Sequence, residues 1–242
     1  MAQTSFPTTR TIMPTAPHSH TIIFLHGRGS DAATFQAEIL KTQDSNDAFF
    51  KDIFPGIKWV FPEAKKRWAE IDKEEMHQWF DMESVREPWK NAQGQQNALL
   101  ESTQLVLSIV KKEVEFVGSK NVILAGISQG CATATYTLLT SGFELGGLFG
   151  LCGWLPSLDE TETMRTKGLA KQIPVLLQHC EDDDVVPIAN GRDLGERLDM
   201  MGFEVQWQSF KEGGHWLNEP DGMDGFVSFI LQIMHTNEAA GT

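Results

Sequence analysis

Long hydrophobic runs are missing from this sequence. No stretch approaches the roughly 18 apolar residues that a membrane-spanning helix needs, and residues 1–20 lack the apolar centre of a secretory signal peptide. Cysteine is also scarce, because Cys131, Cys152 and Cys180 form an odd set whose spacing fits no zinc-binding pattern. Their small or apolar neighbours predict buried, reduced thiols. We therefore expect a soluble protein of a reducing compartment, which favours the cytoplasm.

Basic residues are in deficit. The chain has 20 Lys and Arg against 33 Asp and Glu, which gives a net charge of −13 over 242 residues. Nucleic-acid binding requires a basic face, so no nucleic-acid partner is expected, and the acidity is interpreted as a means of solubility. The hydrophobic fraction of 41% is ordinary for a globular protein with a proper core.

Short apolar runs alternate with helical patterns along the chain, without an internal repeat. Strands are predicted at 21–27, 57–62, 121–126, 145–153, 173–180 and 203–210, and helices at 31–43, 95–118, 129–142, 188–202 and 221–235. Continuously apolar strands are typical of a mostly parallel sheet with helices on both faces, in an α/β fold. We expect an extended or flexible segment over 1–17, one domain over 18–236 and a flexible tail over 237–242.

The sharpest motif is Gly-Ile-Ser-Gln-Gly at 126–130, directly after one predicted strand and directly before a predicted helix. A serine hydroxyl is a weak nucleophile that must be exposed, oriented and activated. A tight turn between strand and helix lifts the hydroxyl to the top of the sheet, and flanking glycines are needed because a Cβ would clash there. Ser128 is therefore the predicted nucleophile.

His215 follows a strand and two glycines and precedes the last helix. It comes after both Ser128 and the four consecutive acids at 181–184, which is the chain order of an α/β-hydrolase triad. One of these acids would orient His215, and the residues alone do not say which. A calcium or magnesium site is the rival interpretation of the acids. No spaced-ligand loop and no second carboxylate cluster accompanies them, so no metal is predicted.

Acyl transfer also needs preset donors for the oxyanion of the tetrahedral intermediate. The glycine-rich turn after the first predicted strand can present the backbone amide of Arg28, and the serine turn can present that of Gln129. His26 precedes the nucleophile in the chain, and we expect it to hold the loop rather than to act as the base.

Together these stretches resemble the acyl-protein thioesterase family, which is also called the phospholipase/carboxylesterase family of α/β-hydrolases. The matching stretches, in the family's order over about residues 18–234, are IFLHGRGSD, FPEA, WFDMES, VILAGISQGCATA, GLFGLCGWLP, HCEDDDVVP and KEGGHW. Several motifs at matching intervals are more specific than one serine turn.

The resemblance implies an α/β-hydrolase fold and a cofactor-free serine hydrolase. Its expected substrates are short acyl esters, lysophospholipids or S-acylated protein cysteines. By position it assigns Ser128, Asp183 and His215 as the triad, with the amides of Arg28 and Gln129 as the oxyanion donors. Trp79, Phe80 and Asp81 match a family motif beside the active site, so the resemblance implies that they belong to the substrate pocket. We expect Trp216, next to His215, to line that pocket as well. The sequence does not determine the oligomeric state, and both a monomer and a homodimer are compatible with it.

Three positions depart from the family pattern. Arg28 stands where leucine is common, Trp216 where serine or threonine is common, and Cys180 where glycine is common. The Arg28 side chain would either pair with a nearby acid or contact a polar substrate. Two alternatives to a general esterase or thioesterase follow: a specialised hydrolase of one small metabolite ester, and a non-catalytic ligand-binding member of the fold.

Overall fold

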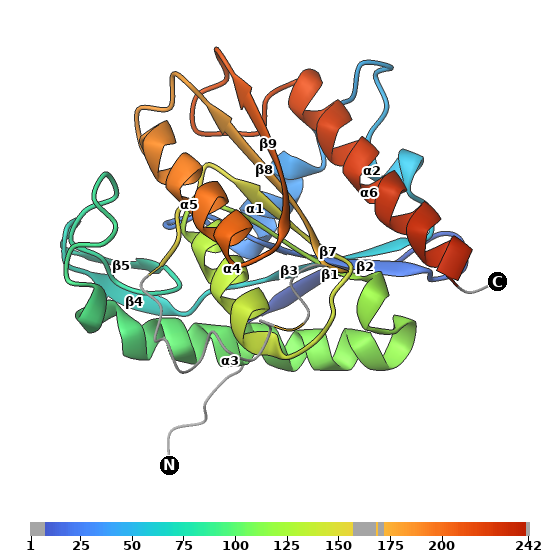
Figure 1. The fold of residues 1–242 in the computed structure, drawn as a ribbon. Helices are drawn as coiled ribbons and strands as arrows, with labels where there is room; N and C mark the ends of the chain where they lie inside the picture. The colour runs from blue at the N-terminus through green and yellow to red at the C-terminus, as the bar shows by residue number, and fades with distance from the viewer. Residues whose placement is uncertain (1–7, 157–167, 169–171, 241–242) are drawn as a thin grey trace.

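The computed structural model describes residues 8–156, 168 and 172–240. Its centre is a seven-stranded sheet with the order β1-β3-β2-β6-β7-β8-β9 (Figure 1). Six neighbouring strands of this sheet run parallel to one another: β2 (His20–Leu25), β3 (Ile57–Pro62), β6 (Val122–Ile127), β7 (Gly147–Leu151), β8 (Pro174–Cys180) and β9 (Glu204–Phe210). Only β1 (Thr9–Ile12) is antiparallel among these sheet strands. The predicted mostly parallel sheet is confirmed.

Alternate residues of each buried strand face opposite layers of helices. In β2, Ile22 and Phe24 join one core cluster, whereas Ile23 and Leu25 join the other. The first cluster includes buried residues of α1 (Ala32–Ile39), α2 (Phe50–Ile53) and α6 (Asp221–Ala240). The second includes buried residues of α3 (Ala92–Val117), α4 (Gln129–Ser141) and α5 (Ile188–Met200). Both faces of the sheet are therefore covered, as the continuous apolar runs predict.

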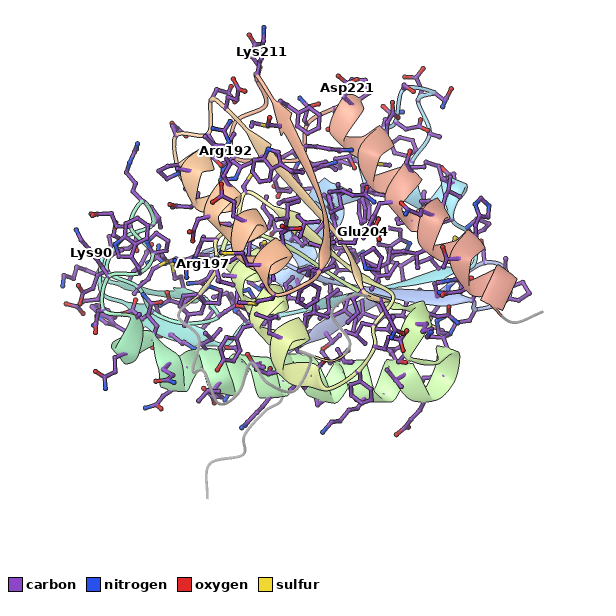
Figure 2. All side chains as sticks on the ribbon, viewed as in Figure 1. Lys90, Arg192, Arg197, Glu204, Lys211 and Asp221 are labelled. Carbon is purple, nitrogen blue, oxygen red and sulfur yellow. The ribbon has the colours of Figure 1, made fainter. Side chains whose placement is uncertain are left out.

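Charged side chains lie around this interior. Lys90, Lys211 and Asp221 are among those that project outward from the periphery of the ribbon (Figure 2). No helix in the described part of the chain has the length and apolar character that crossing a membrane requires.

The segment between β3 and α3 contains a feature that the sequence pattern does not predict. It forms a two-stranded antiparallel hairpin of β4 (Lys66–Ala69) and β5 (Glu74–His77), separate from the main sheet. A 3-10 helix, η1 (Ser119–Asn121), then leads from α3 into β6. A half-buried strand is recognised by alternating apolar and polar residues, and strands this short contain too few residues to show that alternation. The sequence of this segment therefore predicts no strand.

The expected domain limits differ from the structure at both ends. The β-branched run at Thr9–Ile12 pairs with β3 and so belongs to the sheet, although the sequence analysis sets the domain's start at residue 18. Helix α6 continues to Ala240, past the expected limit at 236. Residues 13–17 lie outside the helices and strands, and the amides of Thr15 and Ala16 both donate to the Pro55 carbonyl oxygen. Residues 1–7 and 241–242 lie outside the described part of the chain.

Candidate active site

Ser128 stands on a strained turn between β6 and α4. Its φ of 56° and ψ of −121° are unusual for a residue with a side chain. A Cβ on Gly126 would lie 2.4 Å from the Gly130 backbone, and a Cβ on Gly130 would lie 2.4 Å from the Leu25 carbonyl oxygen. The two glycines therefore allow the turn to pass against β2. This places the Ser128 side chain at the start of α4, beyond the carboxyl end of β6.

His215 lies close to one acid of the four. Its Nδ1 is 2.7 Å from Oδ2 of Asp183, whose side chain is buried. The other carboxylate oxygen of Asp183 accepts hydrogen bonds from the amides of Val185 and Val186, at 2.9 and 2.8 Å. With both oxygens engaged, Asp183 is fixed and can orient the His215 ring.

A second histidine, His179, supports Asp183 from the interior. Its Nε2 lies 3.1 Å from Asp183 Oδ2 and 2.9 Å from the Val186 carbonyl oxygen. Burial disfavours a charged Asp183, but hydrogen bonds from His179 and His215 outweigh it and hold the pKa of this carboxyl well below its usual range. Asp183 is thus an anion in the folded protein. The sequence does not predict this role for His179, whose only signal is its place at the end of an apolar strand.

The neighbouring acids have other roles. Asp182 accepts hydrogen bonds from the amides of Gly213 and Gly214, at 3.3 and 2.8 Å, and so shapes the turn that carries His215. Gly213 and Gly214 have positive φ values of 135° and 62°, which that turn requires. Glu181 and Asp184 are exposed. One acid of the run points inward while its neighbours stay at the surface.

Cys152, His179 and Asp183 form the one group in the described residues whose ligand atoms could surround a metal, all within 4.8 Å of one another. Burial, with the charge of Asp183 as a further cause, raises the pKa of the Cys152 thiol well above its usual range. A metal needs the thiolate, so this site disfavours one.

The turn after β2 presents the first predicted oxyanion donor. Within the described residues, the amides of Arg28 and Gln129 donate to no protein acceptor, so both remain available. His26 holds this turn: its Nδ1 donates to the Gly27 carbonyl oxygen at 2.7 Å, and its Nε2 accepts from the Ala64 amide at 3.0 Å. Burial lowers the pKa of His26 to about 4, so the ring is neutral and can accept.

A cavity of about 240 Å³ brings several predicted residues together. Ser128, His215, Arg28 and Trp216 all line it. Four apolar side chains that the sequence does not predict for the site also line it, namely Phe35, Val85, Ile127 and Val185, and the remaining lining residues are Gly27, Ser30 and Glu38. The Trp216 ring packs edge-on against Phe35, with centroids 6.0 Å apart. Nucleophile, base and a largely apolar surface thus share one pocket.

Trp79, Phe80 and Asp81 are not among the residues that line this cavity, whereas the resemblance places them in the substrate pocket. Trp79 and Phe80 are fully buried, and the Trp79 indole donates to the His26 carbonyl oxygen at 2.8 Å. Asp81 accepts from the Glu70 amide at 3.3 Å and so supports the hairpin. These residues hold the walls of the site in place.

The side chain of Gln129 links that segment to the serine turn. Its oxygen accepts from the Trp79 amide at 2.9 Å, and its nitrogen donates to the Phe80 carbonyl oxygen at 2.7 Å. Gln129 therefore has a second, structural task beside the one predicted for its backbone amide.

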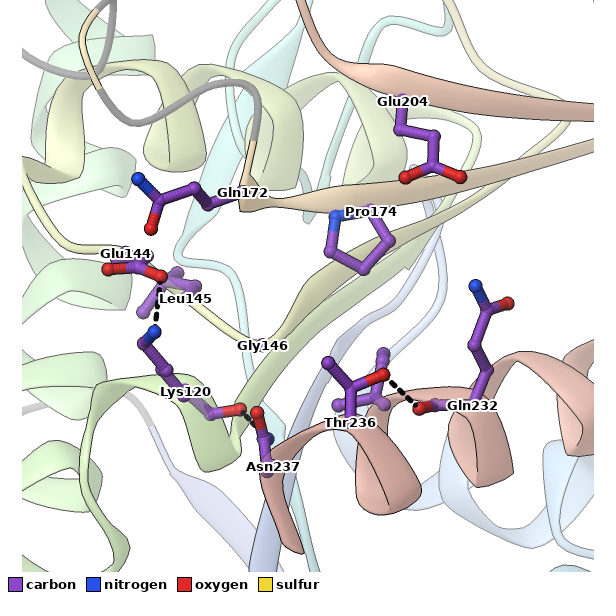
Figure 3. A pocket seen from close by; sticks show the side chains of 11 residues that line it. Lys120, Glu144, Leu145, Gly146, Gln172, Pro174, Glu204, Gln232, Thr236 and Asn237 are labelled. Atoms are coloured by element: carbon purple, nitrogen blue, oxygen red, sulfur yellow. Dashed lines mark hydrogen bonds and ion pairs between the residues drawn. The ribbon is translucent and has the colours of Figure 1, made fainter. Parts of the chain in front are cut away.

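A larger groove of about 350 Å³ lies elsewhere, between the C-terminal part of α6 and the amino ends of β8 and β9 (Figure 3). Its charged residues are Lys120, Glu144 and Glu204, and Lys120 pairs with Glu144 at 2.7 Å. It contains none of the predicted site residues. The smaller cavity is therefore the candidate active site.

Comparison with known proteins agrees with this geometry. The sequence model described as Phospholipase/Carboxylesterase matches residues 7–233. The chain belongs to that family. Acyl-protein thioesterase 1 of Schizosaccharomyces pombe is 29% identical to it over 73% of this chain and 74% of the relative. A family relative from Oryza sativa, named a probable inactive carboxylesterase, is 25% identical over 93% of this chain and 89% of its own.

Among solved structures, acyl-protein thioesterase 2 of Zea mays superposes with a TM-score of 0.78 and 24% identity, covering 94% of this chain and 99% of the maize chain. This likeness shows a shared fold, the α/β-hydrolase fold of the phospholipase/carboxylesterase family, as the resemblance implies.

Proposed function

We propose that this member of the phospholipase/carboxylesterase family hydrolyses carboxylic esters and thioesters through an acyl-enzyme on Ser128. In the proposed reaction, His215 removes the proton of Ser128 while Oγ attacks the acyl carbon. The amides of Arg28 and Gln129 receive the developing oxyanion. His215 then protonates the leaving alcohol or thiol, and later activates the water that releases the acid.

The observation that carries this proposal is the carboxylate–histidine contact beside the nucleophile. The 2.7 Å contact between His215 and a buried, ionised Asp183 fixes the ring tautomer with Nδ1 protonated. The other ring nitrogen is then free to act as a base. Ser128 lines the same cavity as His215, so nucleophile and base face one substrate.

The substrates that fit the proposal are short acyl esters, lysophospholipids or S-acylated cysteines of proteins. Relatives named acyl-protein thioesterases support the thioester class. The mainly apolar lining supports an apolar acyl group. The cytoplasm fits as the compartment, because the three cysteines are free and buried.

A non-catalytic role is the competing proposal, favoured by the Oryza relative whose name describes it as probably inactive. Hydrolysis of p-nitrophenyl butyrate and labelling by a fluorophosphonate probe separate the two. We expect wild-type protein to hydrolyse the ester and to be labelled once, at Ser128. Ser128→Ala should lose both while its unfolding curve is unchanged. Labelling of another serine, or full activity of the alanine variant, would overturn the assignment.

A further inference from the structure

Arg28 contributes a charged side chain to an otherwise mainly apolar pocket. It lines the cavity together with Ser128, yet its side chain is only 13% exposed. Arg28 is therefore part of the cavity wall, and most of its side chain is withdrawn from solvent. The partners of the guanidinium determine whether its charge is available to bind a substrate.

Two partners from the hairpin region fix the guanidinium. Its Nη2 donates to Oδ2 of Asp72, in the turn between β4 and β5, and forms an ion pair with it. Its Nε donates to Oε1 of Gln78 at 3.2 Å. Gln78 is itself fully buried and donates to the Trp68 carbonyl oxygen at 2.9 Å, so it cannot follow a moving arginine.

The backbone strengthens the same connection. The Gly29 amide donates to the His77 carbonyl oxygen at 2.9 Å, which ties the residue after Arg28 to the end of β5. Charge-assisted hydrogen bonds are stronger than neutral ones, and a planar guanidinium held at two positions loses its freedom to swing. The hairpin therefore sets the position of the Arg28 side chain.

This arrangement answers the question that the sequence left open. The charge of Arg28 is already met by Asp72, so it is not an unpaired receptor for a substrate carboxylate. Arg28 is a fixed polar residue in a cavity that the apolar Phe35 and Trp216 also line, together with Glu38. An acyl chain long enough to reach Arg28 would have to displace a side chain that is mostly buried and hydrogen-bonded to both Asp72 and Gln78.

We propose that the Arg28–Asp72 pair limits the length of acyl chain that the cavity accepts, with Asp72 and Gln78 as positioning residues that act through Arg28. This inference rests on the proposed function, because it concerns the substrate of the same site. Asp72→Asn removes the ion pair and leaves at most a weaker, neutral hydrogen bond, so the guanidinium can move away from the wall. Arg28→Leu removes the wall and keeps the amide that the oxyanion needs.

The test is a double-mutant cycle read on p-nitrophenyl esters from acetate to dodecanoate. We expect Asp72→Asn to raise the ratio of kcat/KM for decanoate over butyrate on the order of tenfold, the gain from burying one or two more methylene groups. The change should appear mainly in KM for the long ester. In an Arg28→Leu background the same Asp72→Asn change should have no further effect, since the two residues act as one unit.

Matched variants separate this role from general damage to the hairpin. Asp72→Glu keeps the charge and should restore much of the wild-type profile. Glu75→Gln, an exposed change on the same hairpin, should leave the profile unchanged. Equal chain-length profiles for wild type and Asp72→Asn, or additive effects in the Arg28→Leu background, would overturn the proposal while ester hydrolysis itself stands. Absence of hydrolysis by wild type for every ester would instead overturn the proposed function and this inference with it.

Discussion

At the residue scale, the four adjacent acids at 181–184 differ in the direction in which their side chains point, although all four are carboxylates. Like charges that share a buried site would raise one another's pKa, so only one of them can serve as an ionised partner for His215. Asp183 turns inward to two histidines and two amides, whereas Asp182 caps the glycine turn that carries His215. The residue pattern alone could not make this choice, because it does not show loop direction. The family's spacing selects Asp183, and this is the acid that lies 2.7 Å from His215 Nδ1.

We expect Asp183→Asn to lower kcat about 10³- to 10⁴-fold on p-nitrophenyl butyrate, because an amide there favours the wrong tautomer of His215. Asp184→Asn is the matched control, since this side chain is exposed, and it should change kcat less than threefold or so. Asp182→Asn should fall between them through its effect on the glycine turn. A larger loss at Asp184 than at Asp183 would show that the register taken from the family is wrong.

At the element scale, the sequence predicts the strands that are buried in the core. It does not predict the features that depend on tertiary contacts. Continuous apolar runs predict the buried strands β2, β3, β6, β7 and β8, because such runs are typical of strands covered on both faces. Strand β9 is predicted too, although its sequence EVQWQSF alternates and it is only partly buried. The serine turn is predicted by the steric need for Gly126 and Gly130. The hairpin β4–β5 and the edge strand β1 are missed because each of these strands is only four residues long, and the partner of β1 is also distant in sequence. The inward place of Trp79 also depends on tertiary contacts.

The connection between the serine turn and the 79–80 segment gives a prediction at the same scale. Gln129→Leu leaves the Trp79 amide and the Phe80 carbonyl buried without their partners. Each such loss costs about 1–3 kcal/mol, so the free energy of unfolding should fall by about 2–6 kcal/mol in urea denaturation. Gln93→Leu, an exposed change on α3, should shift it by less than about 0.5 kcal/mol. Similar values for the two variants would mean that this connection carries little stability.

At the scale of the whole molecule, the site is assembled at the carboxyl ends of parallel strands from segments far apart in the chain. The turns after β2, β6, β8 and β9 supply Arg28, Ser128, Asp183 and His215, as expected for ligand sites of such sheets. His26 joins this assembly to the fold, since it bonds both the oxyanion turn and the segment after β3. The stability of the domain and the form of its site are therefore coupled through one neutral histidine.

This coupling predicts how stability depends on pH. The pKa of His26 is lowered by burial from 6.5 to about 4, so the unfolded chain binds this proton more tightly than the folded one. The free energy of unfolding must therefore fall as pH drops from about 6.5 towards 4. His26 alone contributes a loss of about 2 kcal/mol by pH 5 and about 3 kcal/mol in full, at 1.36 kcal/mol per pKa unit.

Asp183 adds a further loss only at lower pH. Its folded pKa is also depressed, but its stabilising contribution is lost below the unfolded value of about 3.9. Urea denaturation at pH 7, 6, 5 and 4.5 measures the His26 window before that carboxyl titrates. In His26→Gln the side chain cannot take up a proton, although its oxygen can accept from the Ala64 amide as Nε2 does. We expect this variant to be less stable than wild type at pH 7 but to lose about 2 kcal/mol less between pH 7 and pH 5. Parallel pH curves for the two proteins would show that His26 titrates alike in the folded and unfolded states, and that the neutral ring does not hold the oxyanion turn.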